Sequence, residues 1–241
     1  MDSKYGSLYR RLYEHHWWWR AREALILRHL LRRRPAGGFG RILDVGCGDG
    51  LFFERLAALG DPEGVEPEAA LVSPDGPWSD RIHVRPFDSA FEPGYRFGLI
   101  LMLDVLEHLE DDLAALRHAT SLLSPGGLLV ITVPAFQSLW TAHDDLNHHF
   151  RRYRHQHLQR LASAAGLNLS PCRYFFHWLV PLKLGVRLRE RLLPRDPLPP
   201  EVPGRLFNEL YRKLSLAEQA LFSYFPLPFG SSLLAIGRRR L

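Results

Sequence analysis

The sequence predicts a doubly wound α/β fold whose sheet is mainly parallel. Short apolar runs alternate with helical segments over residues 41–175, and a glycine-rich turn stands between the first apolar run and the next helix. Strands that alternate with helices are typical of a parallel sheet with helices on both faces. The chain has 241 residues, 46% of them hydrophobic, which suits one domain of this class with a sizeable insertion.

The strands are predicted from short apolar runs that are bounded by glycine, proline or charged residues. In chain order they span residues 41–45, 64–66, 81–85, 97–103, 128–133, 167–175 and 233–238. Helical spacing of apolar residues predicts helices over residues 51–59, 105–123, 158–165 and 205–222.

An N-terminal helical region is predicted over residues 5–34, as one long helix or two short ones. Leu8, Leu12 and Leu27 supply part of its apolar spacing, with arginines between them. Pro35 and the glycines after it end the region, because proline cannot continue a helix.

Charge and cysteine content exclude several classes of protein. The formal net charge is +5, which is too small to indicate a nucleic-acid surface, so nucleic acid is not an expected partner. Cys47 and Cys172 lie far apart without metal-ligand spacing, so a disulfide framework is not expected. No apolar run approaches the roughly 18 residues of a spanning helix, and no secretory signal is visible, so we expect no transmembrane segment and a cytoplasmic location.

The stretch from Asp44 to Gly50 carries the strongest chemical signal. Glycines at 46, 48 and 50 allow a tight turn that lies against a flat ligand. Their spacing is G-x-G-x-G, which differs from the G-x-G-x-x-G of dinucleotide sites. A pyrophosphate would be repelled by Asp44 and Asp49, whereas an ammonium or sulfonium group would be attracted. The turn therefore predicts a cationic nucleotide cofactor, S-adenosylmethionine, in preference to a nicotinamide dinucleotide.

Acidic residues also follow the next two predicted strands. Glu66 ends the second strand about 20 residues after the turn, where a carboxylate can accept both ribose hydroxyls in related folds. Asp88 and Ser89 follow the third strand and could bind an adenine edge. Open α/β sheets bind ligands at the carboxyl ends of their strands, so acids at successive strand ends indicate one site.

The series LDVGCGDG, VEP, FDS, LDVLEHL and LSPGGLLVITVP resembles the class I S-adenosylmethionine-dependent methyltransferases, over residues 41–133. The resemblance is strongest to the branch of methyltransferase types 11 and 23, which includes ubiquinone-type O-methyltransferases. It implies a Rossmann-like, seven-stranded sheet with an antiparallel last strand, and S-adenosylhomocysteine as the product. The cofactor contacts that it implies are Asp44, Gly46, Cys47, Gly48, Gly50, Glu66, Pro67, Asp88, Ser89, Leu103, Asp104 and Val105.

A single methyltransferase domain is expected to occupy residues 1–241. Residues 1–36 would form an N-terminal helical lid, and residues 41–175 the cofactor-binding core. A helical, aromatic-rich insertion would occupy residues 176–230, and the last strand would lie within residues 231–241.

The segment after the fifth strand is expected to form a wall of the acceptor site. A base would help a hydroxyl acceptor, and histidine is suited to that role near neutral pH. The candidates are His143 with Asp144 or Asp145, His149, and His108. His143, Asp144, His148 and His149 could instead fix the loop by hydrogen bonds, or bind a metal, although their spacing matches no compact zinc pattern and we expect no metal.

Basic and aromatic residues are the candidates for acceptor binding. Arg151 and Arg152 could clamp a carboxylate or phosphate, or could lie in solvent at a helix start. Trp18, Trp140 and Tyr153 are predicted to line the acceptor site, although tryptophans more often pack in the core.

The segment 174–191 joins an apolar run to several arginines. It could lie at a membrane surface or cover an apolar acceptor. The alternative is an insertion that packs over the sheet edge.

Taken together, the sequence predicts an enzyme that transfers a methyl group to a small-molecule or lipid-linked acceptor, with oxygen as the expected acceptor atom. A transfer-RNA methyltransferase, a nicotinamide-dependent oxidoreductase and a non-catalytic cofactor-binding module are the alternatives. The oligomeric state is left open.

Overall fold

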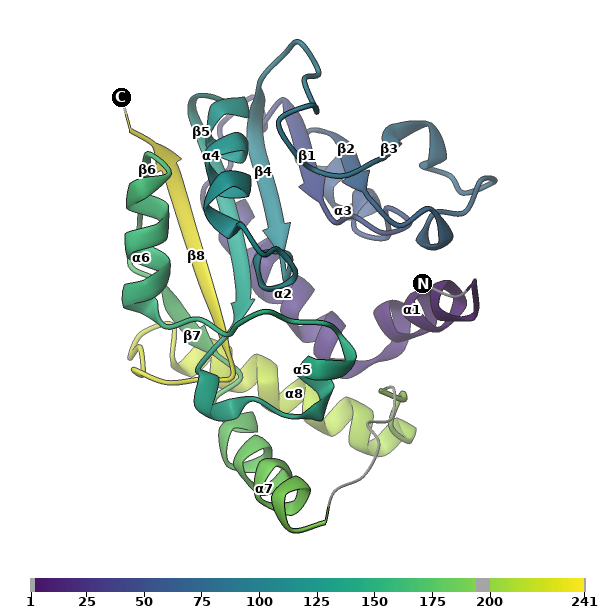
Figure 1. Cartoon of the computed structure of the whole chain (residues 1–241), viewed down its shortest axis with the longest axis vertical. Helices are drawn as coiled ribbons and strands as arrows, with labels where there is room; N and C mark the ends of the chain where they lie inside the picture. The colour runs from purple at the N-terminus through teal and green to yellow at the C-terminus, as the bar shows by residue number, and fades with distance from the viewer. Residues whose placement is uncertain (1–2, 194–199, 241) are drawn as a thin grey trace.

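The computed structural model describes residues 3–193 and 200–240, which form an eight-stranded sheet covered by helices (Figure 1). The strands are β1 (Arg41–Val45), β2 (Asp61–Glu66), β3 (Ile82–Val84), β4 (Phe97–Leu103), β5 (Leu123–Pro134), β6 (Leu167–Leu169), β7 (Arg173–Phe175) and β8 (Ser232–Arg239). Residues 1–2 and 241 of the expected domain, and residues 194–199 of the expected insertion, lie outside the described residues.

The sheet has the order β3-β2-β1-β4-β5-β8-β6, and β7 also pairs with β8. The pairs β1–β2, β2–β3, β1–β4 and β4–β5 are parallel, whereas β8 is antiparallel to β5, β6 and β7. The mainly parallel sheet and its antiparallel last strand were both predicted, and both are confirmed.

The prediction of seven strands is wrong, because the structure divides residues 167–175 between β6 and β7. Ser170 still donates its backbone N–H to the Ile236 carbonyl oxygen (2.8 Å), and Pro171 follows directly. Proline has no N–H to donate to the ladder, so the edge strand ends there and resumes two residues later.

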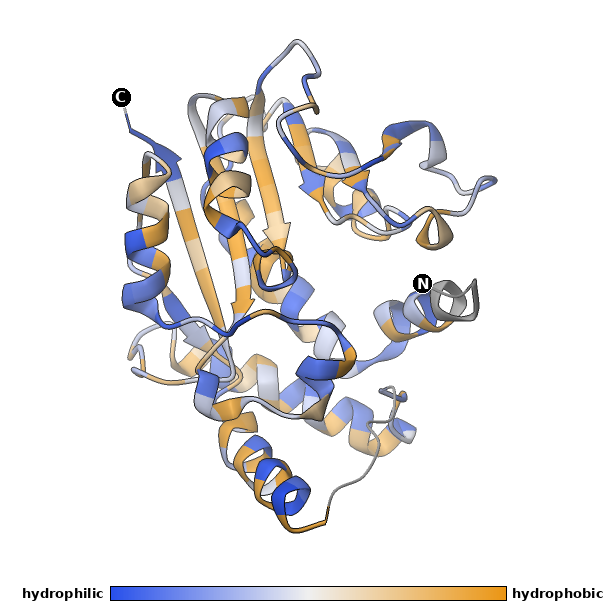
Figure 2. Cartoon of the chain, viewed as in Figure 1, coloured by the Kyte–Doolittle hydropathy of each residue, from blue (hydrophilic) through white to orange (hydrophobic). Residues whose placement is uncertain are grey.

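Helices cover both faces of the sheet. The longer helices are α1 (Ser3–His15), α2 (Trp17–Leu31), α4 (Asp112–Leu122), α6 (His155–Ala164), α7 (Leu179–Leu192) and α8 (Arg205–Leu221). The short ones are α3 (Phe53–Ala57), α5 (Ala142–Leu146), η1 (Ala69–Leu71), η2 (Ser79–Arg81), η3 (Leu106–His108) and η4 (Gln137–Leu139). One core joins the sheet to α4 and α6, and the other joins it to α2 and α3. The central strands are almost continuously apolar (Figure 2), as expected for strands buried on both faces.

The predicted helix over residues 105–123 is interrupted. Residues 106–108 form the 3₁₀ turn η3, and α4 begins only at Asp112. The Asp111 side chain accepts the backbone N–H of Ala114 (2.9 Å) and so caps α4. As a result, Glu107 and His108 lie on a turn close to the end of β4.

The N-terminal region forms two helices that differ in their surroundings. His16 has extended backbone angles between α1 and α2, and its side chain accepts the Trp18 backbone N–H (3.1 Å). α2 packs in the core through residues such as Ala21 and Ile26. α1 instead contacts the glycine-rich turn, through Tyr9 at Gly48 and Arg10 at Asp49.

The insertion is tied to the N-terminal helices. Asn208 of α8 accepts the Trp17 backbone N–H (2.9 Å) and donates to the His15 carbonyl oxygen (2.8 Å). Glu218 accepts the backbone N–H groups of His177 and Trp178 (both 3.1 Å), at the start of α7. Among the described residues, no helix is long and apolar enough to cross a membrane.

Candidate functional site

Three acidic residues meet at the carboxyl ends of neighbouring strands. Asp44 lies near the end of β1, Glu66 ends β2, and Asp104 follows β4. The parallel register aligns these ends, because Val45 lies opposite Val65 on one side and Met102 on the other. The strand order reverses between β1 and β4, and open α/β sheets bind ligands at such a switch point.

The glycine-rich turn has the left-handed backbone that its sequence predicts. Gly46 has a φ of +71° and Gly48 a φ of +55°, conformations that favour glycine. A Cβ at Gly46 would lie 2.9 Å from the Cγ2 atom of Val105, which is closer than carbon atoms pack. The turn after β1 and the residue after Asp104 are therefore in direct contact.

The carboxyl groups at this edge are buried and electrostatically disfavoured. Burial raises the pKa of Asp44 to about 7, and the charge of Glu66 acts in the same direction. Glu66 accepts backbone N–H groups from Gly48 (2.9 Å) and Glu68 (3.0 Å), yet burial still raises its pKa. Buried carboxylates of this kind are stabilised by a cation.

An arginine that sequence reasoning missed reaches this edge from α2. The Nε atom of the buried Arg22 lies 2.7 Å from Oδ2 of Asp104, and its charge also lowers the pKa of Asp44. In the sequence, Arg22 is one of several arginines in the N-terminal helical region, so composition did not distinguish it. Arg22, Asp44, Gly46, Tyr9 and Leu103 are among the residues that line a cavity of about 30 Å³.

Helix α1 contacts the glycine-rich turn. The Tyr9 ring lies over Gly48, where a Cβ would be 3.3 Å from its Cε1 atom. Arg10 forms an ion pair with Asp49, the acid between the second and third glycines. Neither contact was predicted from the sequence.

The structure places the remaining predicted cofactor residues around the same strand ends. Cys47 is buried within the turn, and Pro67 is exposed after β2. Asp88 and Ser89 are exposed after β3, where an Asp88 oxygen accepts the Ala90 backbone N–H (2.9 Å).

Asp144 is the centre of the loop that follows β5. It is fully buried and accepts the Thr141 backbone N–H (2.9 Å), the Nδ1–H of His149 (2.9 Å) and two N–H groups of Arg152 (both 2.8 Å). Burial alone would raise its pKa, but the hydrogen bonds from His149 and Arg152 outweigh burial and hold the pKa well below its usual range. Asp144 therefore stays ionised and fixes both partners.

His149 lies against the turn that follows β4. Its ring centroid is 4.7 Å from that of His108, and the backbone N–H of Phe150 donates to the Glu107 carbonyl oxygen (2.7 Å). Glu107 is buried, its Oε2 atom has no hydrogen-bond partner, and burial together with the charge of Asp104 raises its pKa well above the usual value.

Glu107, His108 and His149 could also hold a metal ion. One ligand atom from each lies within 4.8 Å of the others. A carboxylate and two imidazoles are usual ligands of catalytic zinc, and a metal-bound histidine usually donates its other N–H to a carboxylate, as His149 does to Asp144. The sequence did not predict this grouping, because Glu107 and His149 are far apart along the chain.

Among the other predicted loop residues, Trp140 lies beside this cluster, with its ring centroid 6.5 Å from that of His149. His143 is exposed and contacts Asn147, with 3.2 Å between His143 Nε2 and Asn147 Nδ2, so it does not pair with Asp144 or Asp145. Asp145 instead accepts the indole N–H of Trp140 (2.9 Å).

The two arginines that were predicted to clamp the acceptor, Arg151 and Arg152, form ion pairs within the protein instead. Arg151 pairs with Asp112 (3.0 Å), and the buried Arg152 pairs with Asp144. Tyr153 is fully buried and donates its hydroxyl to Asp112 (2.8 Å). Trp18, another predicted acceptor residue, lies beside the acidic edge, since the Arg22 guanidinium lies over its ring, 5.3 Å from the ring centroid.

Helix α7 lies over the loop and contributes a lysine that the sequence did not single out. Arg187 donates to the Gln137 carbonyl oxygen (3.0 Å), and Glu190 accepts the Ala142 backbone N–H (3.2 Å). Burial, with the charge of Arg152, lowers the pKa of Lys183 to about 8, while Asp144 and Asp104 oppose this shift. Lys183 is therefore close to both the loop and the strand ends.

Left-handed backbone at residues other than glycine gathers at the same edge. Asp104 follows β4, Phe136 follows β5 and Phe176 follows β7, each with a φ of 56° or 57°. His148, in the loop, has a φ of 54°. Such strain costs of order 1–3 kcal/mol per residue and gathers at functional sites.

Comparisons with known proteins point to one family. A family model described as a methyltransferase domain matches residues 18–170. The ubiquinone biosynthesis O-methyltransferase of Azorhizobium caulinodans is 35% identical over 106 residues, which cover 41% of this chain and 42% of that protein. Its counterpart from Ruegeria pomeroyi is 37% identical over 111 residues and is covered to 44%. The chain thus spans less than half the length of these curated relatives.

Solved structures share the fold at low sequence identity. An S-adenosylmethionine-dependent methyltransferase from Clostridium acetobutylicum aligns with a TM-score of 0.62 at 10% identity, covering 99% of this chain and 98% of that one. The N-methyltransferase NodS from Bradyrhizobium japonicum, in complex with S-adenosyl-L-homocysteine, aligns with a TM-score of 0.54 at 18% identity, covering 99% of each chain. At these identities the similarity concerns the fold alone.

Proposed function

The chain belongs to the class I S-adenosylmethionine-dependent methyltransferases, and on that premise we propose that it methylates an oxygen atom of a small-molecule or lipid-linked acceptor. The observation that carries the proposal is the Asp144–His149 pair beside the strand ends. The names of the curated relatives, ubiquinone biosynthesis O-methyltransferases, support oxygen as the acceptor atom.

The acidic edge fits the cofactor. S-adenosylmethionine supplies a methyl group on a positively charged sulfonium and also carries an ammonium group. Asp44 would stabilise this positive charge, since burial without a cation holds its pKa near 7. Each Glu66 oxygen accepts one N–H, which leaves lone pairs for the ribose hydroxyls. We propose that the other contacts are Gly46, Cys47, Gly48, Gly50, Pro67, Asp88, Ser89, Leu103, Asp104 and Val105.

His149 is proposed as the base that accepts the proton of the acceptor hydroxyl. Because Nδ1–H donates to Asp144, the Nε2 atom is left as the proton acceptor. The ionised Asp144 stabilises the imidazolium that forms, and Arg152 holds Asp144 in place. His108 packs against the ring of His149 and limits its orientation.

The grouping of Glu107, His108 and His149 favours a second candidate for the same step. A divalent metal held there would lower the pKa of an acceptor hydroxyl directly. In that case Asp144 would orient His149 as a metal ligand.

The surface of α7 supports a lipid-linked acceptor. Its exposed apolar residues are Leu182, Leu184, Val186, Leu188 and Leu192. Hydrophobic and hydrophilic residues alternate along this helix (Figure 2), and exposed apolar residues next to basic ones suit a lipid surface beside the acceptor loop.

The proposal is tested by release of S-adenosylhomocysteine with a series of catechol and phenol acceptors. We expect His149→Asn to lower kcat by about 10²- to 10⁴-fold, the usual contribution of a positioned base. The matched control is His143→Ala, which removes an exposed histidine of the same loop and should leave kcat unchanged. Equal activity of wild type and His149→Asn on every accepted substrate would contradict the assignment.

Chelation separates the two candidates for proton removal. Activity that survives chelation supports His149 as the base, and activity that is lost and then restored by a divalent metal supports the metal. The transfer-RNA alternative predicts RNA affinity that falls steeply with salt. Fluorescence of a retained nicotinamide would identify the oxidoreductase, and cofactor binding without turnover the non-catalytic module.

A further inference from the structure

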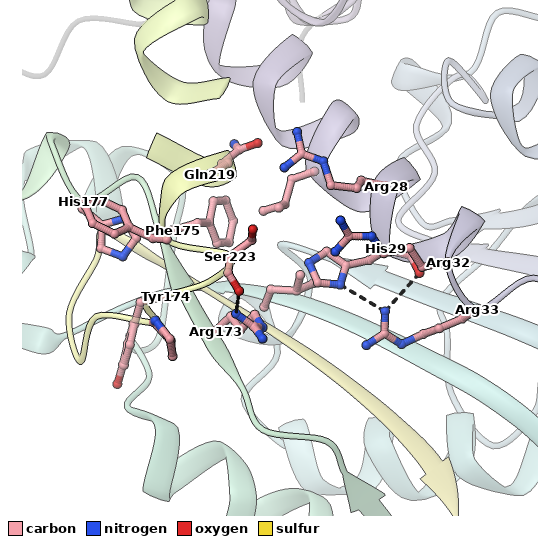
Figure 3. A pocket seen from close by; sticks show the side chains of 14 residues that line it. Arg28, His29, Arg32, Arg33, Arg173, Tyr174, Phe175, His177, Gln219 and Ser223 are labelled. Carbon is pink, nitrogen blue, oxygen red and sulfur yellow. Dashed lines mark hydrogen bonds between the residues drawn. The ribbon is translucent and has the colours of Figure 1, made fainter. Parts of the chain in front are cut away.

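A second cavity lies on the α2 side of the sheet, away from the acidic edge (Figure 3). Its volume is about 400 Å³, within the roughly 300–1,000 Å³ of ligand pockets. Arg28, His29, Arg32 and Arg33 line it from the end of α2, and Arg173 lines it from β7. We call it the arginine cavity. His29 lies seven residues beyond Arg22, or about 10 Å along the helix, so the two sites are separate.

The guanidinium groups of the arginine cavity have no acidic partner. Among the described residues, no carboxylate lines the cavity. Arg33 donates to the His29 carbonyl oxygen (3.2 Å) and Arg173 to the Ser223 carbonyl oxygen (3.1 Å), and Figure 3 marks both contacts. Carbonyl groups are neutral, so the positive charge of the cavity remains uncompensated.

The electrostatics of the cavity are those of an anion site. Burial lowers the pKa of His29 to about 4, and the charges that lower it further are those of Arg33, Arg173, Arg32 and Arg28. Glu218 lies 3.6 Å from Nδ1 of the lining residue His177, and it already accepts two backbone N–H groups.

The end of α2 does not explain this concentration of charge. A helix C-terminus carries only about half a negative charge, which favours one or two cations in the last turn. The three guanidinium groups at this helix end exceed that charge, and the fourth, that of Arg173, comes from β7. An anionic ligand would remove the repulsion.

We propose that the arginine cavity binds the phosphate group of a phosphate monoester that carries an apolar group. Planar guanidinium forks match phosphate oxygens in pairs. The apolar part of the lining is Leu25, Phe175, Phe222, Pro226 and Leu234. Next to it in sequence, Tyr224 and Phe225 are 79% and 70% exposed, so an apolar group that leaves the cavity would meet further apolar surface.

Titration calorimetry on the full chain tests the site with phenyl phosphate, inorganic phosphate, and phosphatidylcholine vesicles with and without phosphatidic acid. Wild type is expected to bind phenyl phosphate one to one, and more tightly than inorganic phosphate. Arg32→Gln and Arg173→Gln should each weaken binding about tenfold or more, as loss of a charged hydrogen-bonding group does. The matched control is Arg34→Gln, which removes the same charge from an exposed neighbour that does not line the cavity.

The outcomes separate the sources of the ligand. Binding of phenyl phosphate but not of vesicles supports a soluble ester, and binding that requires phosphatidic acid and Arg32 supports a lipid headgroup. Absence of phenyl phosphate and vesicle binding, or an equal loss in Arg34→Gln, would overturn the proposal. Arg32 is exposed, so its replacement should leave thermal unfolding without ligand unchanged. The readout is binding, so it does not depend on methyl transfer.

Discussion

Two buried aspartates on the two sides of the site have opposite surroundings. Asp44, at the end of β1, has its pKa raised to about 7 by burial. Asp144, in the loop after β5, has its pKa held well below the usual range, because hydrogen bonds from His149 and Arg152 outweigh the effect of burial. The surroundings of Asp44 do not compensate its negative charge, whereas hydrogen bonds from His149 and Arg152 compensate that of Asp144.

The difference separates a binding group from a supporting group. The protein does not fully compensate Asp44, so a cationic ligand gains free energy by approaching it. The protein does compensate Asp144, so a ligand gains little there, and the role of Asp144 is to hold His149 and Arg152. A buried acid is therefore informative about ligand binding only when its partners are known.

The largest expected effect comes from Asp144→Ala. This change leaves the buried Arg152 guanidinium without its partner, and breaking a buried ion pair costs about 3–5 kcal/mol of unfolding free energy. Denaturant unfolding followed by circular dichroism measures the loss. The control is Asp145→Ala, an exposed neighbour that should cost less than about 1 kcal/mol. Equal losses in the two variants would mean that the buried ion pair of Asp144 with Arg152 does not stabilise the protein as proposed.

Asp44→Asn and Glu66→Ala are expected to act on binding instead. Each should weaken affinity for S-adenosylhomocysteine by about 10- to 100-fold, the usual effect of losing a charged hydrogen bond. Asp44→Asn should not lower the unfolding free energy, because it removes a buried charge that the protein compensates poorly. Calorimetric titration and denaturant unfolding of the same samples measure both quantities. Undiminished affinity in both variants would refute the cofactor site.

The contrast also explains what the sequence could predict. The residues of the acidic edge are local: Asp44, the glycines and Glu66 each stand beside a strand end, and parallel strands bring those ends together. The sequence therefore predicted the sheet and the grouping of these acids. It missed Arg22, because its arrival at Asp104 depends on how α2 packs against the sheet.

The loop was harder to predict because its contacts join distant segments. Because His143 and Asp144 are adjacent in sequence, we predicted that they would pair. In the structure, His149 forms the hydrogen bond to Asp144 instead. The left-handed backbone at His148 accompanies the turn between them, and although histidine adopts this conformation more often than most residues, the sequence does not show which of the loop histidines will do so. Glu107 and Arg187 reach the loop from other elements, so only the fold shows those contacts.

The pKa values of the two aspartates are shifted in opposite directions, and the shift at Asp44 should make cofactor affinity depend on pH. The raised pKa of Asp44 means that its carboxyl is protonated in the folded state below about pH 7 and loses the charge that attracts the cofactor. Affinity should therefore fall by up to about tenfold per pH unit below 7, and Asp44→Asn should abolish this dependence.

Stability follows from the same two shifts. Between the ordinary value of 3.8 and about 7, folding takes up a proton at Asp44, so its contribution to stability falls as pH rises. The lowered pKa of Asp144 contributes stability above 3.8, and that contribution is lost as pH falls below it. The unfolding free energies of Asp44→Asn, Asp144→Ala and wild type, measured from pH 3 to 8, test both signs. A pH trend in the opposite direction for either variant would contradict the corresponding assignment.

The smallest expected effect concerns helix α1, which is predicted to act as a lid. Arg10 pairs with Asp49 across the surface between α1 and the glycine-rich turn, and its side chain is 40% exposed. Exposed ion pairs contribute up to about 1 kcal/mol and are screened by salt, so Arg10→Ala should raise the cofactor dissociation rate less than about tenfold. Stopped-flow release of a fluorescent cofactor analogue at low and high salt measures the change. If α1 acts as a lid, added salt should speed release from wild type and have little effect on Arg10→Ala. An identical response of both proteins to salt would mean that this ion pair does not hold α1 over the turn.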